Sequence, residues 1–331
     1  MQNFWGNFLT FWTLVRGYSM PISIMSWIVP FLFALYGGGS LRFGVLALIG
    51  IIFVHMASNL FDDVIDYIRE KKDIDNGLKT DFNFQKGKCI VIRDGRISLN
   101  LAILTSLFLF LIPLLIGIYF IYIWGFDLFY IIFPAAILCL SYPILGCLGL
   151  GEIIIAIIFS PLIYLGVYYV MTGGFSLEIL LISISTGFLC VSVLHNHMLL
   201  DFNFDSQNRK ITLCTLCKNK KNALSLLIVF ILLSYINILI CFFAGKLSIF
   251  YFLPLLTIPS AYLMIKNMKL HIENPKNKIK YNILMGLMPQ LKNATEDERN
   301  FLVKFFLAQN LLTSFTLLLC VSIILDNKCT L

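Results

Sequence analysis

Nine long apolar runs, separated by short polar segments, constrain this chain more than any other feature of its sequence. Hydrophobic residues make up 59% of the 331 residues and charged residues 13%, which excludes a water-soluble globule. A run of about 20 apolar residues is long enough to cross a bilayer as a helix. The predicted spans cover residues 20–37, 43–61, 99–120, 127–144, 150–171, 176–200, 222–243, 247–265 and 300–325.

These spans predict an all-α, polytopic membrane protein. Helices are expected because the bilayer offers no hydrogen-bond partners to open backbone, and no run alternates as a barrel strand does. We expect a single intramembrane domain over residues 1–331, in which nine helices form one bundle around a central cavity open to the cytoplasmic face. The segment before Arg16 lacks the basic start of a secretory leader, so no cleavage is expected.

Charge is distributed unevenly between the connections, and this predicts an orientation. Basic residues concentrate in the loops at about 66–98, 201–221 and 266–299, whereas the other loops carry only Arg42 and Lys246. The positive-inside rule places the basic loops and the N-terminus in the cytoplasm of a cell whose inner (plasma) membrane holds the protein, with the C-terminus outside. These loops account for the net charge of +7, so no nucleic-acid partner is expected. No obligate protein partner is expected either.

Acidic residues cluster where the second span meets the cytoplasm. Asp62, Asp63, Asp66 and Glu70 recur at helical spacings of three and four residues, with Asn59 one turn earlier, so their oxygens share one face. Neighbouring carboxylates at a membrane boundary repel one another and are costly unless a multivalent cation neutralises them. An all-oxygen donor set of this kind favours Mg²⁺, which commonly bridges carboxylates to substrate phosphates.

A second acidic pair ends the sixth span. Asp201 and Asp205 are four residues apart and follow Asn196 and His197. Two such clusters at one membrane face predict two Mg²⁺ ions around a single diphosphate, with basic side chains of the adjoining loops taking up the remaining charge. Lys210, five residues beyond Asp205, is the strongest basic candidate.

The two clusters resemble the signatures of the UbiA-type intramembrane prenyltransferases, which read Asn-Asp-x-x-Asp-x-x-x-Asp and Asp-x-x-x-Asp. Asp63 and Asp66 match the first two acids, while Asp62 replaces the signature asparagine and Glu70 stands where the last aspartate is usual. Arg16 is similar to the family's opening arginine. The resemblance runs over most of the chain.

Within that family, the sequence is most similar to the branch that prenylates 1,4-dihydroxy-2-naphthoate in menaquinone synthesis. The features that carry this likeness are Asn59, the stretch from Arg93 to Ser98, Tyr142 with Pro143, and the segment from Gly149 to Glu152.

The resemblance implies Mg²⁺-dependent transfer of a polyprenyl group from its diphosphate to an aromatic acceptor. The implied catalytic residues are Asp63, Asp66, Asp201 and Asp205, and the implied metal ligands are these four with Asp62 and Glu70. Substrate contacts are implied for Asn59, Asp62, Arg16, Lys210, Arg93, Tyr142, Glu152, Asn196 and His197.

Several alternatives remain at this point. The acceptor could instead be 4-hydroxybenzoate, homogentisate, a lipid glycerol phosphate or haem, and the chain could be an inactive scaffold of the same fold. A cation-coupled transporter would place its acids deeper in the spans.

Glu152 could orient the acceptor or simply bond a neighbouring helix, and His55 is expected to be packed and hydrogen-bonded. A zinc site of histidines 195 and 197 with cysteines 214 and 217 is disfavoured by the spacing.

Overall fold

The computed structural model describes residues 2–83, 88–208, 210–274, 282–288 and 295–330, and over these residues it is helical and forms no β-sheet. Within this described part, nine helical segments are long and apolar enough to cross a membrane, which confirms the nine predicted spans of a multi-pass membrane protein. They cover Gly17–Tyr36, Leu41–Asp75, Leu99–Trp124, Phe126–Leu145, Gly151–Thr172, Leu177–Leu200, Lys220–Phe243, Ile249–Glu273 and Phe301–Asn327.

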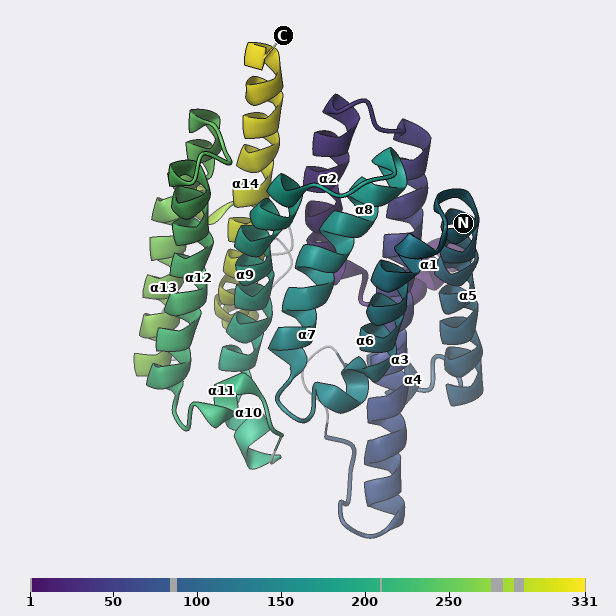
Figure 1. Ribbon diagram of the computed structural model, residues 1–331. Helices are drawn as coiled ribbons and strands as arrows, with labels where there is room; N and C mark the ends of the chain where they lie inside the picture. Colours follow the sequence, from purple (N-terminus) through teal and green to yellow (C-terminus); the bar gives the residue numbers. More distant parts are fainter. Residues whose placement is uncertain (1, 84–87, 209, 275–281, 289–294, 331) are drawn as a thin grey trace. The chain divides into compact units, whose positions relative to one another are not determined.

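The chain divides into two compact units, which we describe separately. Figure 1 labels the helices of both. Unit 1 comprises residues 1–24 and 42–145, and unit 2 comprises residues 25–41 and 146–331. Unit 1 contains α1 (Gln2–Leu14), α3 (Leu41–Asp75), α4 (Ile90–Arg93), α5 (Leu99–Trp124) and α6 (Phe129–Leu145). Unit 2 contains most of α2 (Met20–Tyr36), then α7 (Gly151–Ile157), α8 (Ile163–Thr172), α9 (Leu177–Leu200), α10 (Phe202–Gln207), α11 (Leu213–Leu216), α12 (Lys220–Phe243), α13 (Ile258–Glu273) and α14 (Glu296–Thr330).

The core of unit 1 lies along α3. Leu60 and Val64 on α3 are buried together with Val15, which follows α1, and with Val91 and Ile92 of α4. Burial of these side chains anchors two polar segments beside α3, since Arg16 and Lys88 lie within a few residues of them. Apolar packing therefore places the charged groups that the acids of α3 meet.

Helix α5 shows how the same unit meets lipid. Ala102 and Leu109 are buried, while Leu104, Leu107 and Leu111 are exposed on the remaining surface of this largely apolar helix. A helix that is apolar all round is expected to face lipid on the surface that it does not pack. Its Ser98 accepts a hydrogen bond from the backbone N–H of Leu101, which caps the start of the helix.

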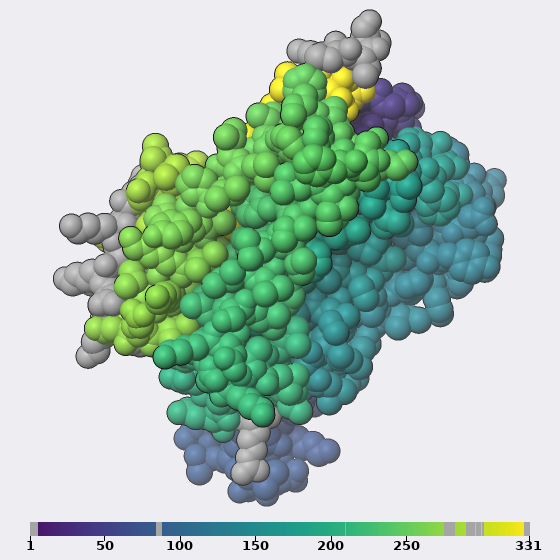
Figure 2. Space-filling view, turned by 60° about the vertical axis from the view of Figure 1, so that its left-hand side comes forward, coloured from purple at the N-terminus to yellow at the C-terminus, as the bar shows by residue number. Residues whose placement is uncertain are grey.

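In unit 2 the most enclosed spans are α9 and α14, in each of which 61% of the most apolar window is buried. Helix α9 packs against α12 and α14. Figure 2 shows α12, in green, forming much of the visible surface with α13 beside it. Leu232, Ile236 and Ile240 of α12 are exposed, as expected of a lipid-facing helix.

Small residues let α9 approach its neighbour closely. Between α7 and α8 the chain forms a π-helical turn at Ile158–Leu162, where Pro161 has no N–H to donate. Ser160 in this turn donates to the carbonyl oxygen of Ser183 at 2.6 Å, and Gly187 of α9 faces the same serine. The interface therefore depends on having no side chain at position 187.

Two elements differ from the expectations. Helix α1 precedes the first predicted span and was not expected, because its 13 residues are too few to cross a bilayer. Helix α3 continues to Asp75 rather than ending near residue 61, although its buried residues end at Val64. The first acidic cluster thus lies within a helix and not at its end.

We predict that Gly187→Val lowers the free energy of unfolding by about 1–3 kcal/mol, because overpacking a close interface forces side chains or backbone to shift. A Cβ at this position would lie 2.6 Å from the Cβ of Ser160. Thermal unfolding in detergent measures the change. Gly174→Val is the matched control, since a Cβ there would meet no atom within 4 Å; equal melting temperatures of both variants would contradict the prediction.

Candidate functional site

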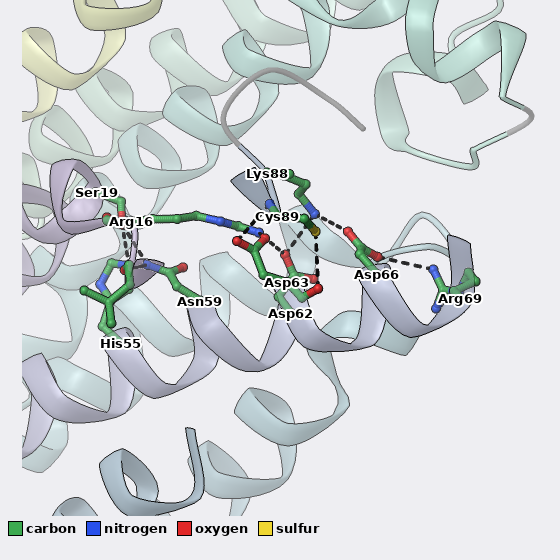
Figure 3. Close-up of polar contacts among 11 residues, drawn as sticks. Arg16, Ser19, His55, Asn59, Asp62, Asp63, Asp66, Arg69, Lys88 and Cys89 are labelled. Carbon is green, nitrogen blue, oxygen red and sulfur yellow. Dashed lines mark hydrogen bonds and ion pairs between the residues drawn. The ribbon is translucent and has the colours of Figure 1, made fainter. Parts of the chain in front are cut away.

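The carboxylates of the first cluster project from successive turns of α3. Asp62 and Asp63 are buried, and Asp66 is half-buried. Because α3 is continuous here, the predicted helical spacing holds, and all three side chains lie beside cationic groups of other segments (Figure 3). Buried carboxylates require such partners, because an isolated buried charge is very costly.

Three cations compensate these acids: Arg16, Lys88 and the exposed Arg69, whose Nη1 lies 3.5 Å from Asp66 Oδ1. Arg16 donates from Nη2 to Asp62 Oδ2 at 3.0 Å and also to Asp63, while Lys88 donates from Nζ to Asp62 Oδ2 at 2.9 Å and to Asp66 Oδ2 at 2.6 Å (Figure 3). Asp62 therefore joins Arg16 and Lys88 in one network. The Nε atom of Arg16 is buried and has no hydrogen-bond partner among the described residues. Its N–H can therefore donate to a further acceptor.

The acids control the ionisation of Arg16 and Lys88. Burial by itself lowers the pKa of Arg16, but the negative charges of Asp63 and Asp62 outweigh it and hold the pKa well above its usual value. The pKa of Lys88 is raised in the same way, because Asp62 and Asp66 outweigh the effect of burial. Both side chains therefore stay protonated at every physiological pH.

Cys89 adds a backbone contact that the sequence did not predict. Its N–H donates to Asp63 Oδ2 at 3.1 Å, and its thiol donates to the Asp63 carbonyl oxygen at 3.2 Å. Its φ of 54° is left-handed, which aims the N–H at the carboxylate. Burial, followed by the charges of Asp63 and Asp66, raises the pKa of the thiol, so Cys89 is a neutral donor and not a nucleophile.

Asn59, predicted to contact substrate, donates from Nδ2 to the carbonyl of Val15 and to Ser19 Oγ in the turn that carries Arg16 (Figure 3). His55 bonds Ser19 and Ser23, which confirms that it is a packed, hydrogen-bonded residue.

Glu70 and Arg93 have other partners than the acidic network. Glu70 pairs with Lys79 and accepts from the backbone N–H of Asn83 at 3.3 Å, which ties the loop after α3 back onto that helix. Arg93 is exposed and donates from Nη2 to Asp94 at 2.8 Å; this hydrogen bond, before any other effect, lowers the pKa of Asp94. The metal role of Glu70 and the phosphate role of Arg93 stay predictions.

The second acidic pair lies in unit 2, at the junction of α9 and α10. Asp201 stands between the two helices, and Asp205, in α10, is completely buried. Lys210 places its Nζ 3.9 Å from Asp205 Oδ1, and its predicted contact with the diphosphate stays a prediction. Whether the pairs of the two units share one diphosphate stays a prediction.

Asn196 and His197 precede this pair on α9. Asn196 is buried and donates from Nδ2 to the carbonyl oxygen of Lys304 at 2.9 Å, and the ring of His197 stacks on that of Phe305 with centroids 3.8 Å apart. Tyr142 lies half-buried in α6 of unit 1. Substrate contacts of all three stay predictions.

Glu152 is bonded to a neighbouring helix, one of the two roles that its position allowed. Its Oε1 lies 3.3 Å from His195 Nδ1, and the other ring nitrogen of His195 lies 2.9 Å from the carbonyl oxygen of Ala223. Cys214 contacts the same imidazole at 3.5 Å, but burial and the charge of Glu152 raise the pKa of its thiol. Among the described residues, no group of three or more histidine, cysteine or acidic side chains could hold a metal ion.

The acids of α3 nevertheless have the chemistry of a magnesium site. Asp62, Asp63 and Asp66 supply only oxygen donors, and their partners are cationic side chains and, for Asp63, the backbone N–H of Cys89. Arg16, Lys88 and Arg69, which pairs with Asp66 at 3.5 Å, together match these three negative charges. Because the cluster is already compensated, it fits a divalent ion that arrives with a phosphate ligand, whose negative charge offsets that of the ion.

Known proteins share both the sequence pattern and the fold. The model of the UbiA prenyltransferase family matches residues 20–286. UbiA prenyltransferase domain-containing protein 1 of Gallus gallus is 29% identical over 141 residues, which are 42% of this chain and 41% of that protein. The Danio rerio protein of the same name is 30% identical over the same shares. The chain thus matches less than half the length of these relatives.

Solved structures agree over almost the whole chain. A digeranylgeranylglyceryl phosphate synthase has a TM-score of 0.59 at 18% identity, and the match covers 96% of this chain and 98% of that one. A UbiA homologue from Archaeoglobus fulgidus bound to DMAPP and Mg²⁺ has a TM-score of 0.54 at 16% identity, covering 94% and 99%. These likenesses confirm the all-helical fold.

We predict that Lys88→Met lowers the free energy of unfolding by about 1–3 kcal/mol in EDTA, because Asp62 and Asp66 lose a charged donor. Added Mg²⁺ should stabilise this variant more than the wild type, since a bound cation replaces the missing charge. Thermal unfolding with and without Mg²⁺ measures both effects. Lys72→Met, at an exposed lysine of α3, is the control, and an identical response of the two variants would refute the prediction.

Proposed function

The chain belongs to the UbiA prenyltransferase family, and from this premise we propose that it transfers a polyprenyl group from a polyprenyl diphosphate to an aromatic acceptor. Its enzyme class, prenyltransferase, follows from the family. The observation that carries the proposal is the buried network of α3, in which Arg16 and Lys88 compensate carboxylates that suit a Mg²⁺–diphosphate complex.

The donor diphosphate is proposed to bind between the carboxylates and the cations. Asp62, Asp63 and Asp66 would hold Mg²⁺ together with Glu70, Asp201 and Asp205, and two ions are expected. Bound Mg²⁺ would offset the charge that the diphosphate gains as it leaves. Arg16 supports this assignment, because its buried Nε–H has no partner among the described residues and can donate to a phosphate oxygen. Lys88 and Lys210 would supply further positive charge.

The reaction then needs little covalent chemistry from the protein. The allylic C–O bond breaks, the diphosphate leaves with the electron pair, and an electron-rich ring carbon of the acceptor bonds to the allylic carbon. Loss of the ring proton restores aromaticity. The fixed cations stabilise the leaving group from the start, so no costly reorganisation accompanies bond cleavage. Exclusion of water by the apolar spans would protect the cationic carbon.

For the acceptor we propose 1,4-dihydroxy-2-naphthoate, as in menaquinone synthesis. The stretch from Arg93 to Ser98, Tyr142 with Pro143, and the segment from Gly149 to Glu152 support this branch by resemblance. Acceptor contacts are proposed for Tyr142, His197 and Glu152. The basic loops support an inner-membrane protein with a cytoplasmic N-terminus.

The acceptor can be tested directly. Membranes that carry the protein are incubated with Mg²⁺, a labelled polyprenyl diphosphate and one acceptor of a panel: dihydroxynaphthoate, 4-hydroxybenzoate, homogentisate, a glycerol phosphate lipid or haem. We expect a product whose mass equals prenylated dihydroxynaphthoate. A product from another acceptor alone would overturn the branch assignment but retain the family, whereas no product from any acceptor would count against activity.

We predict that alanine at any of four aspartates lowers the prenyl transfer rate by about 100-fold or more, because the charge that anchors Mg²⁺–diphosphate is lost. The variants are Asp63→Ala, Asp66→Ala, Asp201→Ala and Asp205→Ala. Asp127→Ala, at an exposed acid after α5, is the control and should transfer at the wild-type rate. A wild-type rate in any of the four would remove that residue from the proposed site.

A further inference from the structure

We propose that His55 and Asn59 are positioning residues that act through Arg16. They hold the turn from Val15 to Ser19 in the one backbone shape that directs the guanidinium toward the acids of α3. The proposal rests on the proposed function only in that Arg16 is taken to meet the donor diphosphate. Every residue in it lies in unit 1.

The turn needs such support because its backbone is strained. Arg16 has φ 50° and ψ 49°, the left-handed region, which costs a non-glycine residue of order 1 kcal/mol. A peptide with freedom to relax would leave this conformation, and the direction of the arginine side chain would change with it. A conformation of this kind persists only when its surroundings determine it.

Asn59 spans the strained residue. Its Nδ2 group donates to the Val15 carbonyl at 3.1 Å, just before Arg16, and to Ser19 Oγ at 2.9 Å, three residues after it (Figure 3). The two N–H groups of one amide therefore bond both sides of the turn, and we call this pair of hydrogen bonds, together with those of His55, the clamp. A side chain of equal size without donors would fill the space but leave these oxygens unpaired.

His55 completes the clamp from the preceding turn of α3. Ser19 Oγ donates its single proton to the carbonyl oxygen of Arg16 at 2.8 Å, so at 3.0 Å from His55 it accepts from ring Nε2. The other ring nitrogen, Nδ1, is then an acceptor for the hydroxyl of Ser23, 2.5 Å away. The tautomer of His55 is thus determined by its partners, and the imidazole fixes Ser19, which in turn fixes Arg16.

The register on α3 explains why this arrangement is effective. His55 and Asn59 are four residues apart, and Asp63 follows after another four, so anchors and target lie along one helix face. The helix therefore sets the distance between the groups that hold the turn and the carboxylates that Arg16 reaches. Loss of the clamp should loosen the guanidinium without removing it from the chain.

The test compares His55→Leu and Asn59→Leu with the wild type in prenyl transfer and in donor binding. We expect the donor KM to rise about tenfold while kcat changes by less than about threefold, since Arg16 remains present but samples other positions. His55→Gln should recover most of the donor affinity, because its amide can still donate to Ser19. Donor binding is read independently as thermal stabilisation by Mg²⁺ with geranyl diphosphate, without any acceptor.

A double-mutant cycle separates positioning from general stability. In an Arg16→Ala background, His55→Leu and Asn59→Leu should raise the donor KM no further, because the side chain that they position is absent. Asn237→Leu is the matched control: its Nδ2 donates to the Leu181 carbonyl at 2.9 Å and to Ser185 Oγ at 2.8 Å within unit 2. It should lower stability and leave the donor KM unchanged.

Each outcome supports or overturns one proposal. Effects that add to that of Arg16→Ala, or that Asn237→Leu reproduces, would overturn the positioning role. Wild-type donor binding without prenyl transfer to any acceptor would sink the proposed function, while the cycle in donor binding still decides the role of His55 and Asn59. Absence of donor binding in the wild type would overturn both.

Discussion

Compensation of the α3 carboxylates by Arg16 and Lys88 is the interaction on which the rest of unit 1 depends. Asp62 and Asp63 are buried within a helix that otherwise packs apolar side chains. Neither carboxylate could stay charged there without a cationic neighbour. The two cations come from separate segments, and buried apolar residues beside each one keep it in place. Hydrophobic packing and charge compensation thus require each other, because each places the groups that the other uses.

The arrangement also suits a substrate that carries both charges. Under the proposed function, a metal–diphosphate complex would present a cation to the carboxylates and an anion to the arginine and lysine. Preformed pairs keep the side chains desolvated and oriented before the substrate arrives, which lowers the cost of organising them on binding. The same network therefore stabilises the protein and, under the proposed function, would also prepare it for the donor.

Much of the fold was predictable, because each membrane span is a long apolar run and hydropathy needs no tertiary information. Helix α1 was not predictable, because it is too short to cross a bilayer. The extension of α3 was not predictable either, because it runs through a polar stretch whose low hydropathy indicates a loop. The helical spacing of the α3 acids was also predictable. Their pairing with Lys88 and Cys89 was not, because no local pattern relates residues more than 20 positions apart; it depends on how α4 packs. The hydrogen bonds of Asn59 and His55 around Arg16 likewise come from tertiary contacts, although the packed, hydrogen-bonded character of His55 was predicted.

The unbroken length of α3 has a consequence for how the enzyme meets its membrane. From Leu41 to Asp63 the helix rises about 1.5 Å for each of 22 residues, or about 33 Å, close to the thickness of the hydrocarbon layer. The continuous helix α3 thereby fixes the distance of the carboxylates from one surface of the bilayer. A bilayer that is thicker or thinner than this distance would change the tilt of α3. Under the proposed function, the thickness of the bilayer would then help to decide whether the diphosphate of the donor reaches the acids.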